Sequence, residues 1–318
     1  MGGSGLLVFS LSRATYALPE IYGQSSGYRL DRSLHTMGMP LISASDLLAQ
    51  MDSFLLLDAR QEATDYGAGH LPGAIHADLN RHLSTASDPG HDPARGGRHP
   101  LPPIARFAAQ VGAWGIGPAT KVAMYDASGG SNAAARLWWM LRALGHERVR
   151  VLDGGLQAAL GAGMILTVEN AAIEPASPYP TDRWHLPQMD ADGVEALRRD
   201  PSQKLLDVRS AERWRGDSEP FDPVAGHIPG SLNLAWNNNL NPDGRFKSPQ
   251  ALRAQYEALL GGIPPERLTV HCGSGVTACH TLLALEVAGL PGASLYVGSW
   301  SEWCRSGREM SPAPKIRT

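Results

Sequence analysis

The sequence has few of the features that mark several other classes of protein. It contains only 3 cysteines in 318 residues, an odd number without metal-ligand spacing. This pattern excludes a disulfide framework and favours a reducing compartment, so we expect a cytoplasmic protein without a metal or cofactor. The formal net charge of −3 gives no basic surplus that would attract nucleic acid or an anionic membrane. No apolar run reaches the roughly 18 residues that a membrane span needs.

The chain contains an internal repeat. Two segments share an apolar strand, then Asp-x-Arg, then a polar stretch and Gly-His-[Leu/Ile]-Pro-Gly: LLLDAR…GHLPG and KLLDVR…GHIPG. Asp58 and Asp207 correspond at a spacing of 149 residues (207 − 58). Further along, Asp126 stands opposite Cys272 at a spacing of 146 residues (272 − 126). Two long matches at nearly one spacing indicate a duplicated domain, with a working site at the thiol and a retired site at the carboxylate.

The repeat sets the expected domain organisation. Residues 1–38 fit neither copy and are predicted to be a poorly ordered extension, because their short apolar patch lacks the basic start of a secretory signal. We predict an inactive domain at 39–164, a linker at 165–181 and a catalytic domain at 182–318. Alternating short apolar strands and helices predict an α/β fold, with two tandem domains that each hold a mainly parallel sheet flanked by helices. Ser45 is expected to cap the first helix.

The stretch LTVHCGSGVTACH is the most informative part of the second copy. An apolar, β-branched run stops at Cys272, a Gly-Ser-Gly loop follows, and a helix is expected to begin near Thr277. Inward-pointing amides and a helix N-terminus both stabilise negative charge, so Cys272 should ionise more readily than a free cysteine. Ligands also bind outside the carboxyl ends of the strands in such sheets. The alternative interpretation is a buried cysteine that ends a core strand.

On these motifs the chain resembles the tandem rhodanese-fold sulfurtransferases, specifically the 3-mercaptopyruvate type. The resemblance covers residue 39 to the end and rests on GHLPGA, GHIPGS, WWMLRALGH, VLDGG, CGSGVT and GSWSEW. It implies that the cysteine thiolate takes a sulfur from a donor, becomes a persulfide, and passes the outer sulfur to a thiol or cyanide. The implied acceptor is a small thiol or a thioredoxin-like protein.

The expected donor is 3-mercaptopyruvate, with thiosulfate as the alternative. Thiosulfate-preferring members usually carry two basic residues after the cysteine, where this chain has Gly273 and Ser274. A non-catalytic sulfur-binding module is a weaker alternative, since it predicts a damaged loop and this loop is intact. A cysteine phosphatase would need an arginine at the end of a longer loop, and Ala278 stands there.

The resemblance also implies the catalytic residues. Cys272 is the nucleophile, and His99, in the motif GRHPLP, moves protons together with the loop residue Ser274. GRHPLP lies in a long loop rich in proline, glycine and serine, and loops of that length are usually functional or disordered. Asn80 stands where the family has an aspartate, and Asp78 lies two residues earlier as the other candidate partner of His99.

The substrate-binding residues follow from the same motifs. Arg213, in DVRSAERWRG, matches the family's carboxylate-binding arginine, and an arginine can hold a carboxylate through two parallel bonds. Phe221 falls in the stretch where the family has a second arginine, so Arg213 acts alone or with a loop arginine such as Arg95 or Arg98. Backbone amides of the loop are expected to hold the sulfur anion, and they belong to Gly273, Gly275, Val276 and Thr277.

Residues that recur in both repeats are predicted to be structural. They are the pairs Asp58 and Asp207, Arg60 and Arg209, and His70 and His227. Of the two other cysteines, Cys279 is expected to be buried and Cys304 exposed. The pair Trp138–Trp139 is expected in the core and at the domain interface, because no basic groove accompanies it.

Overall fold

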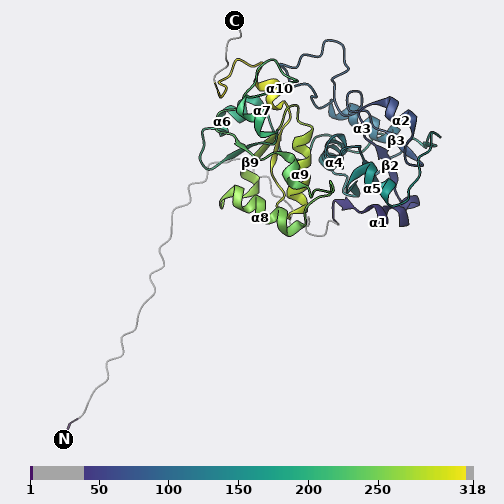
Figure 1. Cartoon of the computed structure of the whole chain (residues 1–318), viewed down its shortest axis with the longest axis horizontal. Helices are drawn as coiled ribbons and strands as arrows, with labels where there is room; N and C mark the ends of the chain where they lie inside the picture. The colour runs from purple at the N-terminus through teal and green to yellow at the C-terminus, as the bar shows by residue number, and fades with distance from the viewer. Residues whose placement is uncertain (3–38, 313–318) are drawn as a thin grey trace. The chain divides into compact units, whose positions relative to one another are not determined.

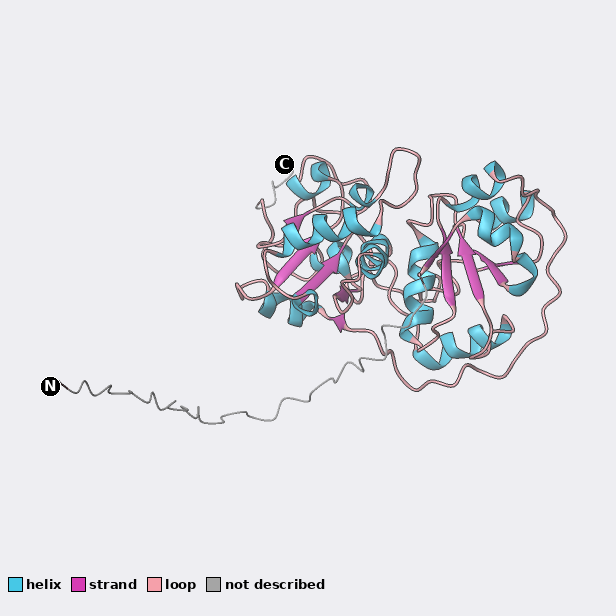
Figure 2. Ribbon diagram, turned by 90° about the horizontal axis from the view of Figure 1, so that it is seen from below, coloured by secondary structure: helices cyan, strands magenta, loops and turns pink. Residues whose placement is uncertain are grey.

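The structure is a computed structural model that describes residues 1–2 and 39–312. The predicted extension at residues 1–38 therefore lies, from residue 3 on, outside the described residues. Two α/β units make up the rest, and each has its strands between helices (Figures 1 and 2). The expected fold class is confirmed.

The first unit holds a five-stranded sheet in the order β1-β5-β4-β2-β3, with every pairing parallel. Its elements are β1 (Leu41–Ile42), α1 (Ala44–Ala49), the 3₁₀ turn η2 (Met51–Ser53), β2 (Leu55–Asp58), α2 (Ala63–Ala68), β3 (Ala74–His76), α3 (Ile104–Ala113), β4 (Val122–Tyr125), α4 (Ala133–Ala143), β5 (Val149–Leu152) and α5 (Gly155–Gly161).

The second unit repeats this topology in the order β6-β10-β9-β7-β8, again wholly parallel. Its elements are β6 (Gln188–Met189), α6 (Ala191–Leu197), β7 (Lys204–Asp207), α7 (Ala211–Arg215), β8 (Leu232–Asn233), η3 (Trp236–Asn239), α8 (Pro249–Leu260), η4 (Pro265–Arg267), β9 (Leu268–His271), α9 (Thr277–Val287), β10 (Ser294–Tyr296) and α10 (Ser299–Trp303). The central strands β4 and β9 are buried along their whole length, as helices on both faces of a parallel sheet require.

The first helix begins at Ala44, two residues earlier than a cap at Ser45 would allow. Ser43 has an extended backbone, and its Oγ accepts the N–H of Asp46 at 3.0 Å. Ser45 lies inside the helix, so the expectation that it forms the cap is wrong. The reason is local. An N-cap side chain accepts the N–H of the residue three positions later, and the first-turn N–H that needs an acceptor belongs to Asp46, three residues after Ser43.

The recurring Asp-x-Arg residues build the same buried ion pair in both units. Asp58 accepts the backbone N–H of Arg60 at 2.9 Å, and its carboxylate binds the guanidinium of Arg60 at 2.6 Å. Asp207 and Arg209 repeat both bonds at 3.0 and 2.6 Å. Each guanidinium also donates to a glycine carbonyl further along the chain. These contacts confirm a structural role for the pairs.

The two recurring histidines are also structural. The Nδ1 atom of His70 lies 2.9 Å from the carbonyl of Tyr66, and that of His227 lies 2.7 Å from the carbonyl of Trp214. Each ring stacks on the side chain of the same partner, with centroids 3.8 and 4.1 Å apart.

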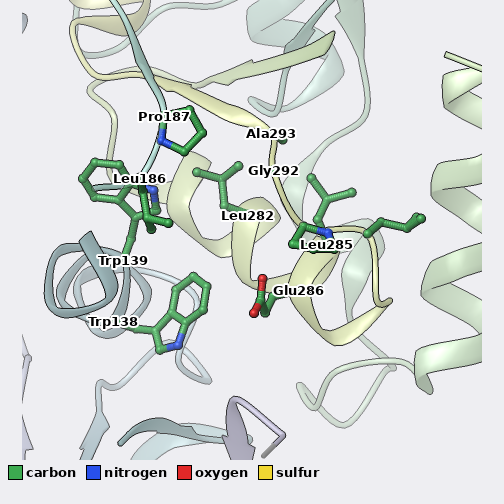
Figure 3. A pocket seen from close by; sticks show the side chains of 11 residues that line it. Trp138, Trp139, Leu186, Pro187, Leu282, Leu285, Glu286, Gly292 and Ala293 are labelled. Atoms are coloured by element: carbon green, nitrogen blue, oxygen red, sulfur yellow. The ribbon is translucent and has the colours of Figure 1, made fainter. Parts of the chain in front are cut away.

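The two units share one apolar core through α4 and α9. Trp138 and Trp139 of α4 are buried in the same cluster as Leu282 and Leu285 of α9, which confirms the core and interface role of the tryptophan pair. A small pocket lies between these helices, and its walls are largely apolar side chains (Figure 3). None of the predicted site residues lines this pocket, so we place the chemistry elsewhere.

The long loop between β3 and α3, residues 77–103, reaches from the first unit onto the second. Gly96 donates its N–H to the Glu302 carboxylate at 2.8 Å. Gly97 has a φ of +80°, and a Cβ added there would lie 2.3 Å from the carbonyl oxygen of Gly298. The backbones therefore approach as closely as only glycine permits. This approach carries Arg98 and His99 to the carboxyl end of the second sheet.

Candidate functional site

Cys272 directly follows β9 and lies at the start of the thiol loop, residues 272–277. Its side chain is only 1% exposed. The N-terminus of α10 anchors the base of the loop: Cys272 donates its N–H to Ser299 Oγ at 3.1 Å, and Trp300 donates its N–H to the Cys272 carbonyl at 3.0 Å. Gly275 has a φ of +73°, and an added Cβ would lie 2.3 Å from the Val297 carbonyl oxygen. The loop conformation therefore requires glycine at that position.

The backbone amides of the thiol loop are open, that is, without a hydrogen-bond acceptor. Within the described part of the chain, the backbone N–H groups of Gly273, Ser274, Gly275 and Val276 donate no hydrogen bond. Buried N–H groups are normally paired, so a row of four without acceptors is a ready site for an anion. Negative charge on the Cys272 sulfur would meet this need.

The corresponding loop of the first unit, residues 126–134, contains the same arrangement with the carboxyl group of Asp126 as the acceptor. The Asp126 carboxylate accepts backbone N–H groups at 2.8 to 3.2 Å from Ser128, Gly130, Asn132 and Ala134. Burial raises the pKa of Asp126, and the four amides oppose that rise. Asp126 and Cys272 thus occupy equivalent places, one as a fixed anion and the other as a thiol that can become one.

His99 meets Ser274 across the two units. Its Nδ1 atom lies 3.0 Å from Ser274 Oγ, so the structure brings these two predicted residues together. Burial lowers the pKa of His99 to about 4, and the positive charges of Arg136 and Arg98 act in the same direction. The ring is therefore neutral near pH 7, and Nδ1 can accept the proton of the Ser274 hydroxyl.

The partner of His99 on its other side is not fixed by hydrogen bonds. Asn80 donates its backbone N–H to the Asp78 carboxylate at 2.8 Å, and Asp78 donates its own backbone N–H to His82 Nδ1 at 3.0 Å. Among the described contacts, neither the Asn80 nor the Asp78 side chain forms a hydrogen bond with His99. The role of Asn80 stays a prediction.

Two arginines converge beside Cys272. Arg213 of α7 is held by the buried carboxylate of Glu219, with N–O distances of 2.8 and 3.1 Å. Arg98, from the long loop, is held by the buried carboxylate of Asp222. A Cβ added to Gly273 would lie 3.2 Å from an Nη2 atom of each arginine.

Both guanidinium groups lie over the ring of Phe221. Its ring centroid lies 5.1 Å from Arg213 Cζ and 5.5 Å from Arg98 Cζ, and the side chain is 63% exposed. Arg98 is therefore the loop arginine at the site, whereas Arg95 is exposed and pairs only with Asp92 at 3.9 Å. The stretch where the family's second arginine falls thus supplies an aromatic ring that both arginines contact.

Sequence reasoning missed the acids that hold these arginines. Glu219 joins Arg213 to the structural pair, because Arg209 also donates to it at 3.1 Å. Asp222 binds Arg305 at 2.7 Å in addition to Arg98. Although burial acts to raise it, the bonds from Arg98 and Arg305 hold the pKa of Asp222 below its ordinary value. The one available signal was the pair of carboxylates flanking Phe221 in SEPFDP.

The other two cysteines are buried. Burial raises the pKa of Cys279 to about 12 and that of Cys304 to about 11. The expectation for Cys279 is confirmed, but the expectation that Cys304 is exposed is wrong. Cys304 follows α10 and packs in a cluster with Trp300 and Trp303, so its position near the chain end does not put it on the surface. Cys272 alone among the three lies in a loop of open amides.

Within 1–2 and 39–312, no group of three or more His, Cys, Asp or Glu side chains could hold a metal ion. In the same ranges, no helix has the length and apolar character to cross a membrane.

A thiol at the carboxyl end of a parallel sheet, beside backbone amides without acceptors, and a second copy of the fold with a carboxylate in place of the thiol define a two-domain α/β protein with one candidate thiol site. The chain belongs to the rhodanese family: the rhodanese-like domain matches residues 43–162 and again 190–306. It is a tandem member related to the 3-mercaptopyruvate and thiosulfate sulfurtransferases.

Individual relatives cover most of the chain. A probable 3-mercaptopyruvate sulfurtransferase of Pseudomonas aeruginosa is 44% identical over 268 residues, which are 84% of this chain and 92% of the relative. The thiosulfate sulfurtransferase of Bos taurus is 37% identical over 248 residues, covering 77% and 80%. The solved 3-mercaptopyruvate sulfurtransferase of Leishmania major superposes with a TM-score of 0.71 at 29% identity, covering 83% and 73%.

We predict that Asp126→Asn lowers stability without lowering turnover. The new NH₂ group cannot accept the amides that the carboxylate accepts, and an unsatisfied buried group costs about 1–3 kcal/mol. Thermal unfolding and steady-state kinetics measure the two effects, with the exposed Asp52→Asn as control. A loss of turnover by several orders of magnitude at unchanged stability would show that the retired loop takes part in catalysis.

We predict that His99 titrates near pH 4 in the folded protein, below its ordinary value of 6.5. Between these values the unfolded chain binds the proton more readily, so the contribution of His99 to stability is present above pH 6.5 and is lost as the pH falls toward 4. NMR titration of the ring, assigned with His99→Gln, measures the midpoint. A midpoint at 6.5 or higher would contradict the neutral-ring assignment.

Proposed function

We propose that this protein transfers a sulfane sulfur from 3-mercaptopyruvate, through a persulfide on Cys272, to a thiol acceptor. The observation that carries the proposal is the thiol loop with four open amides, because its counterpart holds a carboxylate in the same place. The loop is built for one negative charge at position 272, which a thiolate and then a persulfide supply. The similarity to 3-mercaptopyruvate sulfurtransferases supports the choice of donor.

In the first half-reaction, the Cys272 thiolate attacks the sulfur of 3-mercaptopyruvate. A sulfur–sulfur bond forms, the carbon–sulfur bond breaks, and its electron pair leaves on carbon as the enolate of pyruvate, which then gains a proton. Ser274 and His99 are proposed to move that proton, because their hydrogen bond lies beside the thiol loop. In the second half-reaction, an acceptor thiolate attacks the outer sulfur and releases the Cys272 thiolate.

The persulfide is proposed to rest on the backbone amides of Gly273, Gly275, Val276 and Thr277. The first three belong to the open part of the loop, and Thr277 begins α9, where N–H groups have no partner within the helix. Asn80 stays a proposed orienting partner of His99.

The donor carboxylate is proposed to bind between Arg213 and Arg98. Glu219 uses Nε and Nη2 of Arg213, and Asp222 uses Nη1 of Arg98. Arg213 Nη1 and Arg98 Nη2 donate no hydrogen bond within the described chain, and both groups are partly exposed. The buried acids therefore fix the two arginines while an edge of each stays free for a carboxylate.

The charge balance of this cluster suits a monoanion. Four arginines face three carboxylates, which leaves one positive charge: Arg98, Arg209, Arg213 and Arg305 against Asp207, Glu219 and Asp222. The similarity to thiosulfate sulfurtransferases keeps thiosulfate as a second candidate donor. This dianion would favour fixed positive charge within the loop itself, and residues 273–278 carry none.

The proposal extends to the setting of the reaction. We propose a small thiol or a thioredoxin-like protein as the acceptor, and a cytoplasmic location, since all three cysteines are free thiols. The catalytic domain is proposed to span 182–318, with the inactive domain at 39–164 and the linker at 165–181.

We predict that incubation with donor alone adds one sulfur atom to the protein and that reduction removes it. Cys272→Ser should abolish this gain, because Cys272 alone begins the loop of amides without acceptors, and burial raises the pKa of the Cys279 and Cys304 thiols. Mass spectrometry measures the gain, and Cys279→Ser and Cys304→Ser serve as matched controls that keep most turnover. Full activity in Cys272→Ser would rule out a persulfide on Cys272. A higher kcat/KM for thiosulfate than for 3-mercaptopyruvate would overturn the donor assignment alone.

We predict that Arg213→Lys and Arg98→Lys each raise the KM for 3-mercaptopyruvate. An ammonium cannot reproduce the planar fork, and loss of a charge-assisted contact costs about 2–3 kcal/mol, or roughly 30- to 150-fold. Arg95→Lys, from the same loop, is the matched control and should leave KM unchanged. If both site variants keep the wild-type KM, the carboxylate binds elsewhere.

A further inference from the structure

Arg136 is a buried cation that the mechanism above does not use. It is the fourth residue of α4 in the first unit and is 0% exposed. Its Nη1 atom donates to the carbonyl of Gly275 at 3.0 Å, and its Nη2 atom donates to the carbonyl of His99 at 3.1 Å. Its Nε atom has no partner, and no described carboxylate forms an ion pair with it.

The two carbonyls that Arg136 binds belong to the two loops that form the site. Gly275 follows Ser274 in the thiol loop, and His99 lies in the long loop of the other unit. The bond between His99 Nδ1 and Ser274 Oγ joins the same two loops at 3.0 Å. One planar guanidinium therefore fixes the spacing of the backbones that this bond must cross.

The charge of Arg136 is also unusual, because burying a cation without a carboxylate partner is costly. Burial lowers the pKa of Arg136, while the thiols of Cys279 and Cys272 act in the opposite direction. The equivalent fourth residue of α9 is His280, which is also buried, and burial lowers its pKa to about 3, so it is uncharged near pH 7. A cation therefore stands at this position on α4 and not on α9. It lies against the thiol loop, which is proposed to hold an anion.

We propose that Arg136 is a positioning residue for the sulfur-transfer site. Its fork holds His99 in place over Ser274, and its charge lies behind the Cys272 loop and favours the thiolate. The inference rests on the proposed function only in taking Cys272 as the reacting thiol. It gives the inactive first domain a direct part in the site of the second.

Two substitutions separate the effect of the two hydrogen bonds that Arg136 donates from the effect of its positive charge. Arg136→Lys keeps a cation but cannot bind both carbonyls, so kcat should fall about 10- to 100-fold, since small misplacement of a catalytic group has effects of that size. KM for the donor should change little, because Arg213 and Arg98 are untouched. Arg136→Gln also removes the charge, so the midpoint for alkylation of Cys272 by iodoacetamide should rise by roughly one pH unit or more.

Arg142 provides the matched control. It lies on the same helix and crosses the same interface to Glu286 of α9, with an N–O distance of 3.7 Å. Arg142→Lys and Arg142→Gln should keep kcat within about twofold and leave the alkylation midpoint in place, because they weaken an ion pair whose partner Glu286 lies outside both loops of the site. An equal effect of the Arg142 variants would overturn the inference, since it would reduce Arg136 to an interface residue.

A double-mutant cycle with His99→Ala tests how the fork acts. If Arg136 works through His99, adding Arg136→Lys to His99→Ala should cost little further activity. Additive losses, or a wild-type kcat in Arg136→Lys, would overturn the positioning role. This cycle uses only the lysine variant, so it still tests the positioning role when Arg136→Gln fails to fold.

The alkylation measurement needs no sulfur donor. A shifted midpoint in Arg136→Gln, in a protein that turns over neither donor, would refute the proposed function and leave the electrostatic part of this inference standing. An unshifted midpoint in folded Arg136→Gln would refute the electrostatic part while leaving sulfur transfer intact.

Discussion

The structure depends on one recurring constraint: each unit ends its central strand in a loop of backbone N–H groups that need an anion. The first unit meets the need with Asp126, whose carboxylate accepts four amides. The second unit leaves the same need unmet around Cys272. A buried amide without an acceptor is unfavourable, so this loop favours whatever chemistry puts negative charge on the sulfur. At this position the two units therefore differ in whether the residue that ends the strand is a carboxylate or a thiol.

Buried acidic side chains position the arginines of the site. Arg213 and Arg98 approach Cys272 only because Glu219 and Asp222 hold them there from behind. Glu219 in turn is fixed by Arg209, a member of the structural pair that both units share. The duplicated ion pair was thus extended in one unit toward the reacting atom. Arginines held in this way keep an edge free for an anion and lose little side-chain freedom when they bind it.

The repeat made the fold predictable, since a parallel sheet with the same strand order in each half follows from matched strand and loop patterns. Cys272, Ser274 and His99 were recognisable as candidate site residues because their types and local motifs are distinctive. Glu219, Asp222 and Arg136 were not, because their roles depend on which loops come together across the two units. The predictions that Cys304 is exposed and that Ser45 caps the first helix were wrong for simpler reasons. Neither nearness to a chain end nor the choice between neighbouring serines fixes burial or backbone geometry.

The carboxylate of Asp126 has an evolutionary consequence. Once it became the acceptor for four amides, the retired loop gained a fixed internal anchor on which its own folding depends. A reversion to cysteine would restore a nucleophile but remove that anchor, so the revertant would be less stable before it gained any activity. If the first copy is inactive, as proposed, this cost acts against its regaining chemistry of its own. Its contribution to the site is then made through contacts to its neighbour, as by Arg136 and the loop with His99.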